Sequence, residues 1–179
     1  KWGLWSVAVL CLSGVQVSCD SDDIDADAMY TFKGETVASF CQNAPELSDF
    51  YQLITKCGAD ALLEVYGHYT CFVPNNDAIA AYLEEKGKTL DELTAEEAQR
   101  VVYNCVIRGN AEYTSQDFIA GSLTSMTLAE RYLILSFTND DEGRRVIWVN
   151  DKSKVTTLDQ EVHNGVIHVV DKVIEPSEL

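Results

Sequence analysis

The spacing of apolar residues changes along this chain, and that change limits the folds open to it. From residue 35 to 109 most apolar residues recur every three or four positions, as on one face of a helix. From residue 132 to 174 they alternate or run together, as in strands. Helices that precede most of the strands indicate an α+β domain, because a doubly wound fold would alternate strands with helices.

The first helical stretch is interrupted, which predicts several short helices. The pattern over 35–57 is divided at Pro45, since proline removes a backbone donor and ends a helix before it. A further short helix is expected over 59–65. The segment 69–74, "YTCFVP", then reads as a short strand closed by its proline.

The next two helices carry their own start and stop signals. Asn75 is a suitable N-cap, and Gly87 is a typical residue at which the same helix ends. Thr94 and Glu97 have the spacing of a capping box, in which each side chain bonds the other's backbone N–H. We expect this second helix to end at Gly109.

The last third of the chain predicts hairpins. Two alternating segments, 131–137 and 144–151, flank an acidic loop at 139–143. Further on, Asn164-Gly165 matches a type I′ turn, because both residue types tolerate a positive φ. We therefore expect two hairpins in succession.

The N-terminal residues are expected to direct export rather than to fold. After Lys1 the chain has no charged residue until Asp20, as in a secretory signal. The stretch "QVSC" resembles the lipobox of bacterial lipoproteins, with Gln16 where leucine is usual. We expect a signal peptide over 1–18, with a truncated n-region, and lipidation of Cys19. Ordinary secretory cleavage and an uncleaved membrane helix are the alternatives.

An acidic segment follows the proposed lipidation site. Residues 20–27 contain five aspartates and little apolar surface, so we expect a solvated tether over 19–34. The run also resembles the export signal of surface lipoproteins in one group of diderm bacteria. The alternative is calcium, since Asp23, Asp25 and Asp27 have the spacing of an EF-hand start. That loop would lack its central glycine and its final glutamate.

The overall charge and the motifs that are missing exclude several classes of function. The net charge of −16 argues against nucleic acid as a partner, because phosphate binding requires a basic surface. The sequence has no glycine-rich phosphate loop and no Cys-x-x-Cys pair, so we expect no cofactor and no zinc ribbon.

Four cysteines remain beyond the N-terminal segment, and each lies among apolar residues. Disulfides are permitted in an exported protein, but this apolar context favours buried free thiols. The four are Cys41, Cys57, Cys71 and Cys105.

Two segments resemble the signatures of the fasciclin domain family: "YTCFVPNNDAIAAYL" (69–83) and "NGVIHVVDKVIEP" (164–176). Between them "RVVYNCVIRGNAEYT" resembles the family's tyrosine–histidine segment, with asparagine in place of the histidine. The resemblance implies a fasciclin domain over 35–179, folded as a β-wedge with flanking helices. It assigns a structural role to Phe72, Pro74, Tyr103, Asn104, Asn164, Gly165, His168, Asp171 and Pro176.

His168 lies inside the apolar run 165–170, and three interpretations of it are possible. A catalytic base would need a nucleophile beside it, and no Gly-x-Ser-x-Gly motif is present. A metal site would pair it with His163, but an offset of five residues places the two on opposite faces of a continuous strand. A turn between them would relax this limit, so the metal reading stays open. We favour a packed, hydrogen-bonded histidine.

Trp148 also allows two interpretations. On a strand, core packing is favoured over the stacking of sugars. An exposed aromatic platform with Val146 and Asn150 on the same face, and Tyr132 opposite, is the alternative.

The resemblance implies a non-enzymatic adhesion or matrix-binding module. Together with Cys19, it predicts a lipid-anchored protein of the bacterial outer membrane, surface exposed, that binds an extracellular protein or glycan. Display on the periplasmic face is an alternative location. A structural subunit of an outer-membrane glycan-uptake or envelope assembly is the alternative function, and a hydrolase or metal enzyme is a third.

Overall fold

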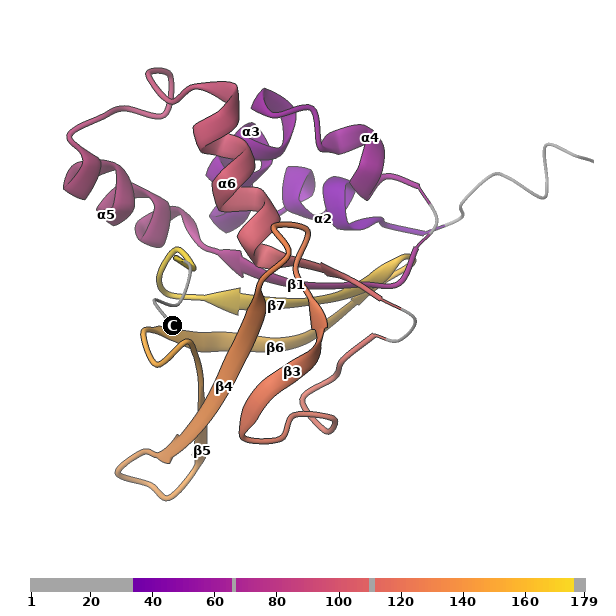
Figure 1. The fold of residues 1–179 in the computed structure, drawn as a ribbon, viewed down its shortest axis with the longest axis vertical. Coiled ribbons are helices and arrows are strands. Elements are labelled where there is room, and N and C mark those ends of the chain that lie inside the picture. Colours follow the sequence, from indigo (N-terminus) through magenta and orange to yellow (C-terminus); the bar gives the residue numbers. More distant parts are fainter. Residues whose placement is uncertain (1–33, 66, 110–111, 176–179) are drawn as a thin grey trace, which may run out of the picture. The chain divides into compact units, whose positions relative to one another are not determined.

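Helices from the first half of the described chain gather on one side of a sheet that the second half mainly provides (Figure 1). The computed structural model describes residues 34–65, 67–109 and 112–175, all within the second of two units, 32–179. The predicted α+β class and the order of helices before most strands are confirmed. The predicted signal peptide, Cys19 and Pro176 lie outside the described residues, as does the acidic segment.

The helices are short, as the interruptions in the sequence require. They are α2 (Val37–Asn43), the 3-10 turn η1 (Pro45–Leu47), α3 (Ser48–Lys56), α4 (Asp60–Leu63), α5 (Asn76–Lys86) and α6 (Ala95–Cys105). Pro45 divides the first stretch as predicted, whereas α4 is shorter than the predicted 59–65.

The predicted caps of α5 and α6 are confirmed. The side chain of Asn75 accepts a hydrogen bond from Ala78 N at 2.9 Å, and Gly87 ends α5 with a φ of 64°. Thr94 and Glu97 form the reciprocal capping box at the start of α6. Each bond joins residues three positions apart, so the local sequence is sufficient to specify it.

The strands form one seven-stranded sheet in the order β2-β1-β7-β6-β5-β4-β3. They are β1 (Tyr69–Pro74), β2 (Val106–Arg108), β3 (Gly121–Met126), β4 (Tyr132–Asn139), β5 (Arg145–Val149), β6 (Ser153–Val162) and β7 (Gly165–Val170). Only β1 and β7 pair in parallel; the other neighbours are antiparallel. A bridge between Ile107 and Thr127 brings the two ends of the sheet together, so the sheet is nearly closed.

The prediction that the second capped helix continues to Gly109 was wrong. Helix α6 ends at Cys105, and the next three residues form β2, antiparallel to β1. The apolar pattern of α6 continues into Val106 and Ile107, which hides the change of structure. Their β-branched side chains suit a strand, and pairing with β1 fixes that conformation. Strand β3 was likewise not predicted, because its sequence lacks regular alternation.

The predicted type I′ turn at Asn164-Gly165 was also wrong. Val162 pairs with Gly165, so the two loop residues are His163 and Asn164. Neither of them has the positive φ that a type I′ turn requires. Gly165 is required for another reason. A Cβ atom there would lie 2.3 Å from the backbone oxygen of Tyr69 on the parallel neighbour β1.

The four predicted free thiols are free in the structure, and three of them are buried. Burial raises the pKa of Cys41 and of Cys105 to about 12, and it raises the pKa of Cys71 well above its ordinary value. Cys57 differs from the prediction because it is only half-buried, at the end of α3. The buried three pack as small apolar side chains of the core.

Candidate functional site

His168 lies in the core of the sheet, where it is 0% exposed. Its ring centroid is 5.2 Å from that of Phe72 on β1 and 4.9 Å from that of Phe118. Phe72 and Phe118 also stack on each other, with centroids 5.8 Å apart. The imidazole is therefore one member of a three-ring cluster.

Both ring nitrogens of His168 are bonded to backbone groups. The backbone N–H of Asp159 donates to Nδ1 at 3.2 Å, and Nε2 lies 2.9 Å from the carbonyl oxygen of Tyr113. An N–H can only donate and a carbonyl can only accept, so the ring is neutral with its proton on Nε2. Burial lowers the pKa of His168, which also favours this neutral form.

Asp159 reaches the ring because β6 is irregular there. The register of β6 against β7 shifts between Thr157 and Gln160, and Asp159 has a φ of 55°. Its N–H leaves the ladder and points to the imidazole. His168 thus has no free nitrogen for acid–base chemistry or for a metal, and the described residues hold no group of three or more His, Cys, Asp or Glu suited to a metal.

Asn164, between β6 and β7, holds three parts of the fold together. Its Oδ1 accepts from Val37 N at 2.9 Å, and its Nδ2 donates to the carbonyl oxygens of Leu63 and Val65 at 2.8 and 2.9 Å. The side chain is buried, so these bonds are shielded from water. The asparagine joins the start of α2 to the end of α4.

The other described motif residues also contact the scaffold. Pro74 ends β1 opposite Val170 on β7, and the Oδ1 of Asp171 accepts from Lys154 N at 2.8 Å. Tyr103 is partly buried and packs against the core. Neither these residues nor His168 line the two grooves described below.

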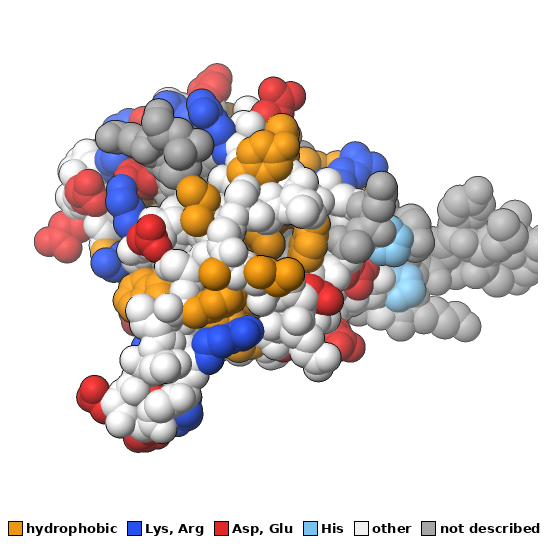
Figure 2. Space-filling view, turned by 60° about the horizontal axis from the view of Figure 1, so that its bottom comes forward, with side chains coloured by type: hydrophobic (Ala, Val, Ile, Leu, Met, Phe, Trp, Pro, Cys, Tyr) orange, Lys and Arg blue, Asp and Glu red, His pale blue; other side chains and the backbone are white. Residues whose placement is uncertain are grey.

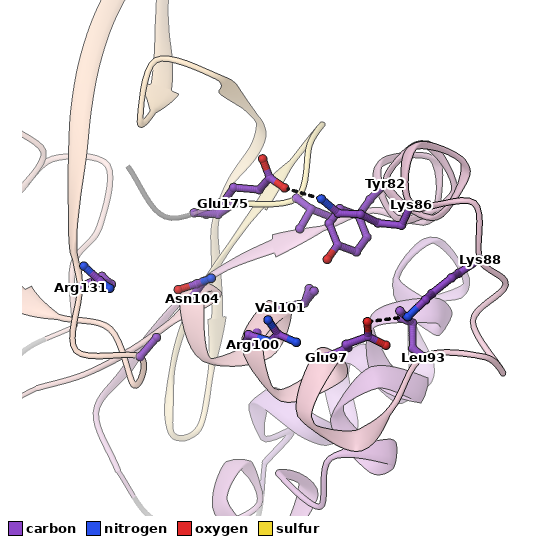
Figure 3. Close-up of a pocket in the computed structure, with 13 residues that line it drawn as sticks. Tyr82, Lys86, Lys88, Leu93, Glu97, Arg100, Val101, Asn104, Arg131 and Glu175 are labelled. Atoms are coloured by element: carbon purple, nitrogen blue, oxygen red, sulfur yellow. Dashed lines mark hydrogen bonds and ion pairs between the residues drawn. The ribbon is translucent and has the colours of Figure 1, made fainter. Parts of the chain in front are cut away.

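Asn104, in contrast, lines a groove of about 570 Å³ between α5, α6 and the segment after β7 (Figure 3). On α6 the residues Glu97, Arg100 and Asn104 recur at helical spacing and face the groove. Helix α5 and the loop after it, the turn between β3 and β4, and the C-terminal segment provide the other walls. Those walls include Tyr82, Lys86, Lys88, Leu93, Ala129, Arg131, Val173, Ile174 and Glu175.

Four cationic side chains and two carboxylates line this α5–α6 groove. Lys88 pairs with Glu97 at 2.5 Å, and Lys86 pairs with Glu175 at 3.2 Å. The hydrogen bond from Lys88 lowers the pKa of Glu97, and the hydrogen bond to Glu175 raises the pKa of Lys86.

The remaining two cations, Arg100 and Arg131, make no ion pair with a described carboxylate, and both are exposed. Figure 3 shows Arg131 and Asn104 on one side of the groove and the Lys88–Glu97 pair on the opposite side. The groove therefore has an excess of positive charge within a chain of net charge −16.

Asn104 is 8% exposed, and no described residue is hydrogen-bonded to its side-chain amide. Within the described part of the chain no fully buried side-chain polar atom lacks a partner, so this amide opens into the groove. The sequence had singled out this position only because asparagine replaces the family's histidine.

A second groove, of about 530 Å³, adjoins the first and shares Tyr82, Val173 and Glu175 with it. Trp148 lines this second groove and is half-buried, so the favoured prediction that it packs in the core was wrong. Its Nε1 donates to Thr138 Oγ1 at 2.8 Å, and its partner across β4 is Ser136 rather than Tyr132. The indole thus borders a groove instead of filling the interior.

Most of the groove residues could not have been found from the sequence. Arg100 lies on α6, Tyr82 on α5 and Arg131 in the turn between β3 and β4, and no motif joins them. The one local signal was the polar face of α6, since Glu97, Arg100 and Asn104 are spaced by three and four residues.

The comparisons with known proteins identify the family. The sequence model of the fasciclin domain matches residues 45–176. The chain belongs to the fasciclin domain family. Mouse Stabilin-2 is 27% identical over 134 residues, which are 75% of this chain and 5% of that protein. Rat Stabilin-2 is likewise 27% identical over 134 residues, 8% of its length. The chain thus spans less than a tenth of the curated relatives it matches.

A solved fasciclin structure confirms the fold. The FAS1 domain pair of the insect cell adhesion molecule Fasciclin I superimposes with a TM-score of 0.64 and 22% identity, over 80% of this chain and 51% of that one. The fasciclin-like mixture of helices and a nearly closed sheet, expected from the two sequence signatures, is therefore correct.

Proposed function

We propose that this fasciclin domain is a non-enzymatic binding module of the cell surface, which attaches to an extracellular protein or glycan. Its family and the adhesion molecule with the same fold support this role. The observation that carries the proposal is the α5–α6 groove. It is open to solvent and presents Arg100 and Arg131, which form no ion pair with a described carboxylate, whereas the imidazole of His168 is fully bonded inside the core.

Attachment to the cell is the second part of the proposal. Lipidation of Cys19 would anchor the chain in a bacterial outer membrane, with the acidic segment over 19–34 as spacer between lipid and domain. Among the described residues no helix has the length and apolar character needed to cross a bilayer. A lipid anchor would supply membrane attachment without such a helix.

Attachment can be tested with beads that carry many copies of the full chain, applied to an array of glycans and matrix proteins. Many copies are needed because one weak domain gains avidity only through multivalent contact. We expect saturable binding to at least one member of the array. Binding to none, with stoichiometric recovery of envelope proteins from native membranes instead, would favour the structural subunit of an envelope assembly.

The anchor can be tested separately by metabolic labelling with a fatty acid. Label should enter the wild-type chain and be absent from Cys19→Ser, whereas Cys11→Ser should not change the labelling of the mature chain. Equal labelling of Cys19→Ser would show that the anchor is elsewhere.

A further inference from the structure

The charge of the α5–α6 groove limits what can bind there. Two of its four cations are neutralised by their ion pairs with Glu97 and Glu175, whereas Arg100 and Arg131 form no ion pair with a described carboxylate. The Nε of Arg100 donates to the carbonyl oxygen of Glu96 at 3.5 Å, which leaves its two terminal nitrogens for a ligand. A planar guanidinium binds a carboxylate through two parallel hydrogen bonds. An anionic group that enters the groove therefore finds partners without displacing either carboxylate.

The open amide of Asn104 adds a second requirement. An amide offers both donors and an acceptor, and here it is almost buried at the wall of the groove. A ligand that covers it must satisfy both kinds of group, since a buried unpaired amide costs binding free energy. A hydroxyl group both donates and accepts, so a polyhydroxylated ligand meets this requirement.

The apolar surface of the groove favours a glycan over an acidic peptide. A peptide is usually held by apolar anchors in pockets, but Leu93, Val101 and Ile174 are at most 3% exposed and offer little such surface. Ala129 and Val173 are partly exposed but small, and the larger accessible apolar groups are aromatic rings. Tyr82 lies between the two grooves, with Lys86 Nζ over its ring at 5.2 Å from the centroid. Trp148 lines the second groove, and a flat ring of this kind suits the face of a sugar ring.

We propose that the two grooves form one site for a carboxylate-bearing glycan. Arg100 and Arg131 pair with a sugar carboxylate, the amide of Asn104 bonds sugar hydroxyls, and Trp148 contacts the next sugar along the chain. This inference rests on the proposed function, whose ligand class it specifies.

The test is calorimetric titration of the full chain with an oligogalacturonate at low ionic strength, where surface electrostatics are least screened. Maltooligosaccharide of equal length is the neutral sugar probe, and an oligo-aspartate is the acidic peptide probe. We expect saturable binding of the oligogalacturonate and affinities at least about tenfold weaker for the other two.

The decisive variant is Arg100→Gln/Arg131→Gln, which should weaken oligogalacturonate binding by about tenfold or more, because it removes charge-assisted hydrogen bonds. The matched control is Arg108→Gln/Arg144→Gln, which removes the same charge from exposed residues outside both grooves. The control should bind within about twofold of wild type. Both variants change exposed side chains, so their circular dichroism should match wild type.

If both double variants lost oligogalacturonate affinity equally, the proposed site would be wrong, because the loss would then depend only on the net charge of the chain. Equal affinity for oligo-aspartate would overturn the glycan assignment, as would the absence of oligogalacturonate binding. If beads carrying Arg100→Gln/Arg131→Gln still attach to the array as wild type does, this inference fails and the proposed binding function stands. If wild-type beads attach to nothing, the proposed function itself fails.

Discussion

The Oδ1 atom of Asn164 accepts a hydrogen bond from the backbone N–H of Val37 at 2.9 Å, between residues 127 positions apart. The same side chain donates to Leu63 and Val65, so one buried amide fixes the N-terminal helices against the last hairpin. Its role in this fasciclin domain is structural, and the predictions below separate such residues from the groove.

Replacing Asn164 with alanine should destabilise the fold by about 3 kcal/mol or more, because it removes two buried hydrogen bonds and one partly buried hydrogen bond to backbone groups. Urea unfolding measures this loss. The control is Asn43→Ala, which removes an exposed side chain and should cost less than about 0.5 kcal/mol. Similar losses in the two variants would contradict the buried role of Asn164.

Gly165→Ala should destabilise the domain more than Gly87→Ala. At residue 165 the new Cβ would lie 2.3 Å from a backbone oxygen of β1, so strands must move apart, at about 3 kcal/mol or more. At residue 87 nothing lies within 4 Å, and only the positive φ of 64° is strained, at about 1 kcal/mol. Thermal unfolding would rank the two, and the reverse order would refute the close packing of β7 on β1.

His168 should make stability depend on pH. Its pKa is lowered by burial in the folded state from an unfolded value of 6.5, so the unfolded chain takes up a proton first as the pH falls. Its contribution is complete above about pH 6.5 and declines below it, by at most about 1.4 kcal/mol per pH unit.

Urea unfolding of wild type and His168→Gln at about pH 7.5 and about pH 5 tests this. The variant should be less stable at the higher pH and should lose less on acidification. A hydrolase or metal centre at His168 would instead show an activity that His168→Gln abolishes without any change in melting temperature.

The cysteines should differ in reactivity. Burial raises the pKa of Cys41 and Cys105 to about 12, so at about pH 8 their thiols are protonated as well as inaccessible. Half-buried Cys57 should be alkylated first among the described thiols, as peptide mapping would show. In urea all of them should react at similar rates. Early labelling of Cys41 in the native state would contradict its place in the core.

The family signatures and the helix caps could be predicted from the sequence because they depend on residues close together in the chain. Asn75 caps a backbone group three positions away, and Gly87 requires only its own left-handed conformation. The α+β class followed in the same way from the period of the apolar residues. The sequence favoured a packed, hydrogen-bonded His168, but it could not identify Asp159 and Tyr113 as the residues that bond the ring.

The tertiary structure decided what depends on distant segments. Strand β2 forms from residues with a helical pattern because β1 lies beside them. The turn between β6 and β7 lies one residue earlier than the sequence predicts, because Gly165 belongs to β7 and passes close to Tyr69. The groove exists only where α5, α6 and the C-terminal segment meet; its Lys86–Glu175 pair spans 89 positions. The charge and the burial of the groove residues depend on how these three segments pack, and the sequence does not give the distances between them.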